Sequence, residues 1–489
     1  MFLACLLCTL LIADVSRLSR AQPGPQAAPM VPKVVEALLV SDIHFEPFWD
    51  PAKVSRLAAS PVSAWARILS APDSPNRQQA FDKIQDACHA RGIDTSFPVL
   101  QSSMRAIRTH AAGARFITLS GDLMAHGFDC KFKKLMPAAT AAEYRAFTVK
   151  TIRFVLAQLQ AAAPGLRIYT ALGNNDSDCG DYKLDANSTF LKQVGEAVTQ
   201  RFPSAERAAA LASFAQTGNY SVMLPAPMTH TRLIVLDDVF FSAKHTACSG
   251  KPDTADQDAQ YAWLAAQLQE ARKAKQNVWV MAHIPPGVDA YGTLAHLSGP
   301  CGRKPTMLLS SDRLAQTLEG EADSIKLGIF GHTHEDEIKL LESGEDAGTT
   351  EHASGGIPVK VVASVSPVNG NLPSFTIAQI EPATATLADY EVIAGSNRVA
   401  WHQQYEYRTA YAEGSFSAAA VAHLIGGFSA DRDERTQPSQ KYIHNFSIGN
   451  PVPLLSLVWT GYVCSMAHQT AEGFSSCACG QQPQSGDRH

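Results

Sequence analysis

The sequence predicts an α/β fold followed by a small helical domain at the C-terminal end. From about Val34, short hydrophobic runs alternate with helical patterns, as expected for strands that are joined by helices. After His334 the runs follow one another without intervening helices, which predicts consecutive strands. Beyond Val399 the pattern changes again, to short apolar stretches with several tyrosines and three cysteines.

Five hydrophobic runs predict the strands that position the site. Each run has the uninterrupted apolar character of a parallel strand that is buried on both faces. If the runs are neighbours in one sheet, their carboxyl ends lie along one rim, where open α/β sheets place their ligands. The runs are Ala37–Val40, Arg115–Leu119, Ile168–Leu172, Val278–Met281 and Lys326–Phe330.

Two helices and four later strands complete the predicted elements. Ala141–Gln160 carries a broad apolar stripe, and Thr254–Lys273 repeats apolar residues at helical spacing. Such stripes indicate helices that face a hydrophobic core. The later strands are Glu337–Leu341, Val359–Ala363, Ser374–Ile380 and Leu387–Val392.

The N-terminus predicts an exported protein. Phe2–Ala13 is apolar but too short to span a bilayer, and Ser19-Arg20-Ala21 fits a cleavage site. Basic residues follow this apolar run, whereas in a typical signal peptide they precede it. An atypical signal, a misplaced start codon, a lipoprotein anchor at Cys5 or Cys8 and an ordinary buried helix therefore stay open as alternatives.

The predicted organisation has five segments. Residues 1–21 are the signal peptide and residues 22–33 a linker rich in Pro, Gln and Ala. Residues 34–398 form the main α/β domain, 399–479 the helical C-terminal domain and 480–489 a disordered tail. We expect the protein to be secreted or periplasmic.

Composition excludes several classes of protein. The chain has 489 residues, of which 45% are hydrophobic and 18% charged, as in an ordinary globular protein. A formal net charge of −5 and the lack of a dense Lys/Arg block argue against nucleic-acid binding. No later stretch predicts a stable membrane span. The sequence does not determine an oligomeric state.

The cysteines predict disulfides. Eight of the ten remain after the signal peptide, and an even number in an exported chain favours pairing. Proximity between loops suggests Cys248 with Cys301, and Cys464 with Cys477 or Cys479. A zinc knuckle is the alternative, although no CxxC pair supports it.

Short polar clusters follow the five strands directly. They contain three types of side chain that bind transition metals well, namely imidazole, carboxylate and carboxamide. Two divalent ions about 4 Å apart can together activate a water and neutralise a phosphoryl group. The clusters are Asp42-x-His44, Gly121-Asp122, Gly173-Asn174-Asn175-Asp176, His283 and Gly331-His332-Thr333-His334.

We predict a site for two metal ions that share one carboxylate. Asp122 is the expected bridge, since it follows a strand and a glycine that allows a sharp turn. One ion would take Asp42, His44 and His334 as its other ligands. The second ion would take Asn174, His283 and His332. Ligand type alone allows zinc, manganese or iron.

These clusters resemble the signature of the calcineurin-like metallophosphoesterase superfamily. His126 in GDLMAH and the sequence from His283 to Gly287 make the chain look most like the acid sphingomyelinase branch. The resemblance covers about Val34 to Cys479 and is most specific in the catalytic part. It implies a four-layer β-sandwich flanked by helices, a pair of zinc ions and phosphodiester hydrolysis in a secreted or lysosome-like setting.

The chain departs from the family pattern at Asn175. The usual GNH motif has a histidine at this position, which helps to bind or protonate the phosphoryl group. Asn can donate a hydrogen bond but does not titrate near neutral pH. We therefore expect Asn175 to orient phosphoryl oxygens and His126 to be the general acid for the leaving group.

The sequence leaves the substrate open. Lipid-hydrolysing members of the family carry a saposin-like domain ahead of the catalytic domain, whereas only the short linker lies there in this chain. We therefore expect the substrate to be a soluble phosphodiester, such as a nucleotide or phosphocholine ester, or a lipid headgroup. A phosphatase or endopolyphosphatase on the same metal pair is one alternative, because we associate endopolyphosphatases with a GNND-like motif. A metal-binding protein without turnover is the other.

Overall fold

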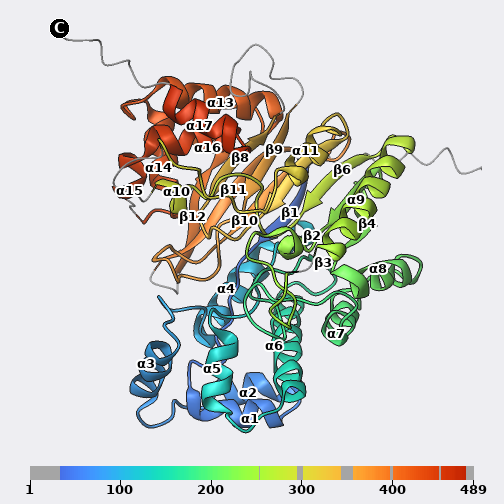
Figure 1. Ribbon diagram of the computed structural model, residues 1–489, viewed down its shortest axis with the longest axis vertical. Coiled ribbons are helices and arrows are strands. Elements are labelled where there is room, and N and C mark those ends of the chain that lie inside the picture. The colour runs from blue at the N-terminus through green and yellow to red at the C-terminus, as the bar shows by residue number, and fades with distance from the viewer. Residues whose placement is uncertain are drawn as a thin grey trace, which may run out of the picture. The chain divides into compact units, whose positions relative to one another are not determined.

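Two six-stranded sheets form the centre of the computed structural model (Figure 1). The structure describes residues 34–252, 254–294, 301–342, 356–396, 400–450 and 453–480. The predicted signal peptide and linker and residues 481–489 of the predicted tail lie outside these ranges. None of the helices in the described ranges combines the length and apolar character that are needed to cross a bilayer.

The first sheet has the strand order β12-β11-β10-β1-β2-β3. Its strands β1, β2 and β3 are parallel, and β10, β11 and β12 continue the sheet with antiparallel pairing. The strands are β1 (Val35–Val40), β2 (Ala114–Leu119), β3 (Arg167–Thr170), β10 (Ser374–Glu381), β11 (Thr386–Ser396) and β12 (Ala400–Glu406).

The second sheet has the strand order β4-β5-β6-β7-β9-β8. Strands β5, β6, β7 and β9 are parallel, and β4 and β8 are antiparallel edge strands. The strands are β4 (Tyr220–Met223), β5 (Thr231–Val235), β6 (Asn277–Met281), β7 (Ile325–Phe330), β8 (Glu337–Leu341) and β9 (Ile357–Val361).

Helices flank both sheets and form most of the C-terminal region. In the first half of the chain they are α1 (Val54–Ala59), α2 (Trp65–Leu69), α3 (Arg77–Ala87), α4 (Phe97–His110), α5 (Phe128–Leu135), α6 (Ala141–Ala162), α7 (Thr189–Val198) and α8 (Ser204–Thr217). In the second half they are α9 (Ala255–Lys273), α10 (Ala290–Leu294), α11 (Arg313–Glu319), α12 (Tyr407–Tyr411), α13 (Ala418–Ala430), α14 (Gln437–Phe446), α15 (Pro453–Leu457), α16 (Trp459–Ala467) and α17 (Ala471–Gly480). Short 3-10 helices are η1 (Pro51–Lys53), η2 (Val62–Ala64) and η3 (Asp238–Phe241).

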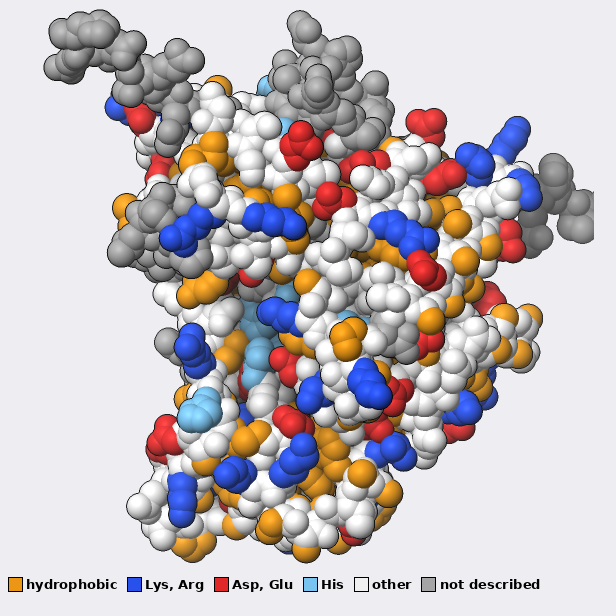
Figure 2. Space-filling view, viewed as in Figure 1, with side chains coloured by type: hydrophobic (Ala, Val, Ile, Leu, Met, Phe, Trp, Pro, Cys, Tyr) orange, Lys and Arg blue, Asp and Glu red, His pale blue; other side chains and the backbone are white. Residues whose placement is uncertain are grey.

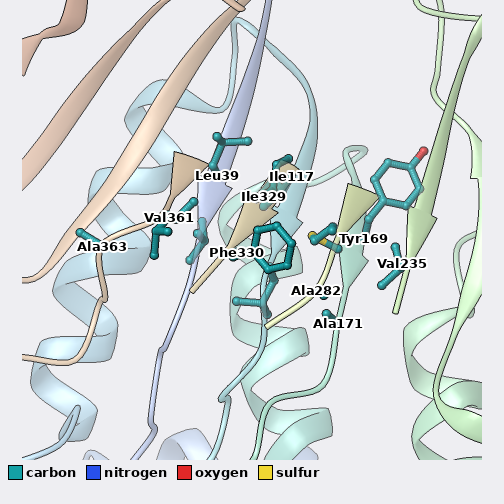
Figure 3. Close-up of a cluster of buried hydrophobic side chains, with 14 of the residues drawn as sticks. Leu39, Ile117, Tyr169, Ala171, Val235, Ala282, Ile329, Phe330, Val361 and Ala363 are labelled. Carbon is teal, nitrogen blue, oxygen red and sulfur yellow. The ribbon is translucent and has the colours of Figure 1, made fainter. Parts of the chain in front are cut away.

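Apolar side chains of the two sheets pack against each other. Leu39 and Ile117 come from the first sheet and Ile329, Phe330 and Val361 from the second, and all five are fully buried (Figure 3). Full burial of one such side chain stabilises the fold by roughly 1.5–3 kcal/mol. Because the parallel strands lie in the interior, both of their faces are apolar, which explains the uninterrupted hydrophobic runs in the sequence.

The predicted fold class is confirmed, but the five runs do not all lie in one sheet. Strands β1, β2 and β3 belong to the first sheet, whereas β6 and β7 belong to the second. An uninterrupted apolar run shows that a strand is buried on both faces but carries no information about its neighbours. The polar clusters consequently meet between two sheets and not along one rim.

The helical C-terminal region is present. Helices α13 and α16 lie against β8 of the second sheet (Figure 1). Strand β12, which follows the predicted boundary at residue 399, pairs with β11, so the first sheet extends past that boundary. The domain boundaries themselves stay predictions.

Four disulfides connect the described part of the chain. Cys464 pairs with Cys477, which was one of the two predicted partners of Cys464. The predicted Cys248–Cys301 pair is wrong, because Cys248 lies beside the loop after β3 and pairs with Cys179, whereas Cys301 pairs with Cys479. The fourth bond joins Cys88 and Cys130. Four disulfides fit a secreted protein.

Candidate metal centre

The loops that follow the parallel strands of both sheets meet at one place. The Nδ1 atom of His283, after β6, lies 2.8 Å from the carbonyl oxygen of Ser120, after β2. The backbone N–H of His332, after β7, donates to the carboxylate of Asp42, after β1, at 3.1 Å. Figure 2 shows histidine side chains inside a hollow on the face in view.

The Asp122 carboxylate lies between two groups of donor atoms. Its Oδ2 atom is 3.4 Å from Nε2 of His44 and 3.2 Å from Nε2 of His283. Asp122 is 2% exposed, so these contacts form in an interior of low dielectric constant. This is the arrangement expected of a carboxylate that two cations share.

The first group contains Asp42, His44 and His334. The Nε2 atoms of the two histidines are 3.1 Å apart, and each lies within 3.6 Å of Oδ1 of Asp42. A ring nitrogen of His126 also lies within 4.8 Å of nitrogens of both histidines. All three residues predicted for the first ion are therefore in contact with one another.

The second group contains Asn174, His283 and His332. The Oδ1 atom of Asn174 is 3.2 Å from Nε2 of His283. Donor atoms of His283, His332 and Asp122 lie within 4.8 Å of one another. The structure thus brings together all seven residues that the sequence suggested as ligands, and their assignment to individual ions stays a proposal.

The backbone at these residues adopts conformations that side chains disfavour. Five of the seven predicted ligands have a positive φ, a region that non-glycine residues rarely occupy. Each such residue costs on the order of 1–3 kcal/mol and persists where the surrounding structure imposes it, often at functional sites. The φ angles are 47° for Asp42, 43° for His44, 52° for Asp122, 74° for His332 and 70° for His334.

Gly121 permits the close approach of His283. Its φ is 99°, and a Cβ atom at this position would lie 2.6 Å from Nδ1 of His283. Any other residue would therefore be strained and would push the imidazole away from Asp122.

The electrostatics indicate a site that requires cations. Burial by itself lowers the pKa of His44 and His283, but Asp122 and the other carboxylates nearby together outweigh it and raise these pKa values to about 9 and about 10. Burial lowers the pKa of His332 and His334 to about 3, so both imidazoles are neutral. Although burial opposes it, the two charged imidazoles hold the pKa of Asp122 well below its usual range.

The donor set fits two divalent transition-metal ions. It combines imidazoles, which bind metals in their neutral form, one carboxamide oxygen and two carboxylates, all of which bind zinc, manganese or iron. His44, His334 and Asp42 would hold one ion, and Asn174, His283 and His332 the other, with Asp122 between them.

His126 lies beside the first group and is held by a residue that the sequence analysis missed. Its ring stacks on that of His44, with centroids 4.1 Å apart. Asp94 accepts the backbone N–H of His126 at 2.8 Å and lies 3.1 Å from its Nδ1 atom. Asp94 is 3% exposed, whereas the side chain of His126 is 37% exposed. Asp94 lies between α3 and α4, in a part of the sequence where no motif indicated a functional residue.

Asn175 contacts the shared carboxylate. Its side-chain N–H donates to Oδ2 of Asp122 and its backbone N–H donates to Oδ1, both at 2.8 Å. The predicted contact of Asn175 with phosphoryl oxygens stays a prediction, since the side chain is directed at Asp122.

Two further buried carboxylates hold the loops in place. Asp176 accepts the backbone N–H groups of Leu123, Met124 and Gly173, and so joins the loops after β2 and β3. Asp238, which the sequence analysis missed, accepts the N–H of His283 at 3.2 Å. Burial raises the pKa of both carboxyl groups to about 7. The sequence did not indicate the role of Asp238, because a single Asp after a strand is not distinctive.

The sequence profile described as Calcineurin-like phosphoesterase matches residues 37–336. This range includes Asp122, the six residues of the two donor groups and His126. The chain belongs to the calcineurin-like phosphoesterase family.

Named relatives place the chain near the acid sphingomyelinase-like phosphodiesterases. Sphingomyelinase phosphodiesterase D of Dictyostelium discoideum is 25% identical over 328 residues, which is 65% of this chain and 66% of that protein. Human acid sphingomyelinase-like phosphodiesterase 3b is 24% identical over 399 residues, 78% of this chain and 80% of that protein. Human cyclic GMP-AMP phosphodiesterase SMPDL3A is 23% identical over 286 residues, 58% of this chain and 57% of that protein. The resemblance read from the motifs is thus confirmed, and these relatives support the predicted class, a metal-dependent phosphoric diester hydrolase.

Metal binding should release protons, because His44 and His283 hold protons near neutral pH and must lose them to bind a metal. Their pKa values of about 9 and about 10 imply that zinc affinity rises with pH up to that range and falls in acid. Isothermal titration calorimetry of the metal-free protein, in buffers of different ionisation enthalpy, measures the release. Identical heats in all buffers would contradict the prediction.

Proposed function

We propose that the protein hydrolyses phosphodiesters, with two divalent ions at the Asp122 site and His126 as general acid. The observation that carries the proposal is the convergence of the two donor groups on Oδ2 of Asp122. When bound, the ion pair would activate a water and neutralise charge on the phosphoryl group. Zinc is the metal that the family resemblance favours.

The position of His126 supports its role as the acid. Its imidazole is the partly exposed member of the cluster with His44 and His334, both of which are buried. The carboxylate of Asp94 contacts the Nδ1 edge of the ring, and this contact fixes the orientation of the proton-bearing side chain. Ser366 in turn donates to Asp94 at 3.0 Å, so the carboxylate is itself fixed.

We further propose that the substrate is a small-molecule phosphodiester or a lipid headgroup. The support is the set of relatives, whose names describe sphingomyelinase-like and cyclic GMP-AMP phosphodiesterases. Nucleotides and phosphocholine esters are the two substrate classes that follow from these names. We also propose that the protein is exported to an oxidising compartment, because its four disulfides would persist there.

Turnover of bis-p-nitrophenyl phosphate and of p-nitrophenyl phosphate by the zinc-loaded protein tests the reaction class. Preference for the diester supports the proposal. Preference for the monoester, or for polyphosphate in a parallel assay, would favour the phosphatase alternative. Stoichiometric metal without turnover would mean a metal-binding protein. Nucleotide, phosphocholine and sphingomyelin substrates then narrow the class.

Replacement of His126 by Ala should affect poor leaving groups most. Hydrolysis of diesters with alkoxide leaving groups should slow by roughly 10²–10⁴-fold, because these leaving groups need a proton, whereas p-nitrophenolate does not. The control is His423→Ala, since His423 is exposed in the C-terminal region. Equal losses for both substrates, or loss of a metal ion from the variant, would show that His126 is not the acid.

Asp94→Asn should produce a smaller loss than His126→Ala, with the same dependence on the leaving group. The neighbouring imidazole of His126, although opposed by burial, holds the pKa of Asp94 below its usual range, so this carboxylate stays ionised. Because hydrogen bonds to ionised acceptors are the stronger ones, a carboxamide should hold the ring of His126 less firmly, and diesters with alkoxide leaving groups should lose more rate than p-nitrophenolate diesters. Asp86→Asn, on the exposed face of α3, is the matched control. Equal losses for both kinds of substrate would leave Asp94 with only a structural role.

A further inference from the structure

We propose that Asp181 and Tyr182 are positioning residues for the second metal ion, and that a disulfide holds them against its ligands. Both residues belong to the segment 177–185, which follows Asn174 and which we call the stapled segment. The inference rests on the proposed function, because it takes Asn174, His283 and His332 as ligands.

Asp181 selects the orientation in which the Asn174 side chain can bind a cation. A carboxamide has an oxygen at one end, which binds metals, and an NH₂ group at the other, which does not. The Nδ2 atom of Asn174 donates to Oδ1 of Asp181 at 2.7 Å. The Oδ1 atom of Asn174 consequently points the other way, to within 3.2 Å of Nε2 of His283. A neutral neighbour would hold this orientation less strongly, because hydrogen bonds to ionised acceptors are the stronger ones.

Tyr182 contacts another predicted ligand of the same ion. Its hydroxyl oxygen lies 3.4 Å from Nε2 of His332, and the two rings are nearly perpendicular. A histidine that binds a metal through one ring nitrogen usually has a partner at the other, which fixes the orientation of the ring. The contact is longer than an ordinary hydrogen bond, so we expect a smaller effect from Tyr182 than from Asp181.

The stapled segment is also fixed by contacts that do not involve the metal ligands. Cys179 forms a disulfide with Cys248. Thr246 accepts the backbone N–H of Leu184 at 3.1 Å and donates its own to Tyr182 at 3.2 Å. The Nζ atom of Lys244 lies 4.9 Å from the centre of the Tyr182 ring. Because the covalent bond and these contacts order the segment, Asp181 and Tyr182 meet the ligands at little further entropic cost.

The test measures metal content and affinity, and not only activity. Asp181→Ala should lower the affinity for one of the two ions by roughly 10–100-fold, the usual effect of losing such a partner, and should leave the other ion unchanged. Asp181→Asn keeps an acceptor for Asn174 and should lose less, and Tyr182→Phe should have a small effect of the same kind. Lys183→Ala, an exposed residue of the same segment, should retain both affinities.

A double-mutant cycle separates positioning from general support of the fold. If Asp181 acts through Asn174, adding Asp181→Ala to Asn174→Ala should cause no further loss of affinity. Additive losses would overturn the inference, as would an Asp181→Ala protein that keeps both affinities. The proposed function would stand in both cases if the wild type binds two ions and turns over diesters, whereas a wild type that binds no metal would refute the function itself.

Discussion

The buried carboxylate of Asp122 is the group on which the site depends. It is the negative charge nearest to His44 of the first sheet and to His283 of the second, and both imidazoles have raised pKa values because of it. Asn175 satisfies it further through two hydrogen bonds. An unpaired buried carboxylate is costly, so Asp122 is stable in this position only with cationic partners, which are protons on histidine or metal ions.

The two-sheet architecture supplies rigid supports for strained loops. Five predicted ligands have backbone angles in the left-handed region, and each of them costs on the order of 1–3 kcal/mol. The hydrophobic core between the sheets and the carboxylates of Asp176 and Asp238, which bind the N–H groups of the loops, oppose this strain. The core and these carboxylates therefore hold the loops of the site in place, as a site that stabilises transition-state charge requires.

The C-terminal region is connected to the catalytic half by buried polar contacts and a disulfide. The backbone N–H of Asp336, two residues after His334, donates to the carbonyl oxygen of Phe446 of α14 at 2.8 Å, and the hydroxyl group of Ser447 donates to the carboxylate of Glu335. Cys479 of α17 is bonded to Cys301, in the segment that follows α10. The helices after β12 thus restrain the loops after β6 and β7, which contribute three of the predicted ligands.

The sequence by itself determined the strands, the order of the polar clusters and the chemistry of seven donors, because apolar periodicity and local residue type carry that information. It did not determine that β6 and β7 leave the sheet of β1, since burial of a strand does not specify its neighbours. The sequence also did not indicate the roles of Asp94 and Asp181 or the Cys179–Cys248 bond. Each of these features depends on a partner distant in the sequence or on a side-chain orientation that only packing fixes. Tertiary structure alone decided that Asn175 meets Asp122, because a carboxamide binds whichever acceptor the fold brings within reach.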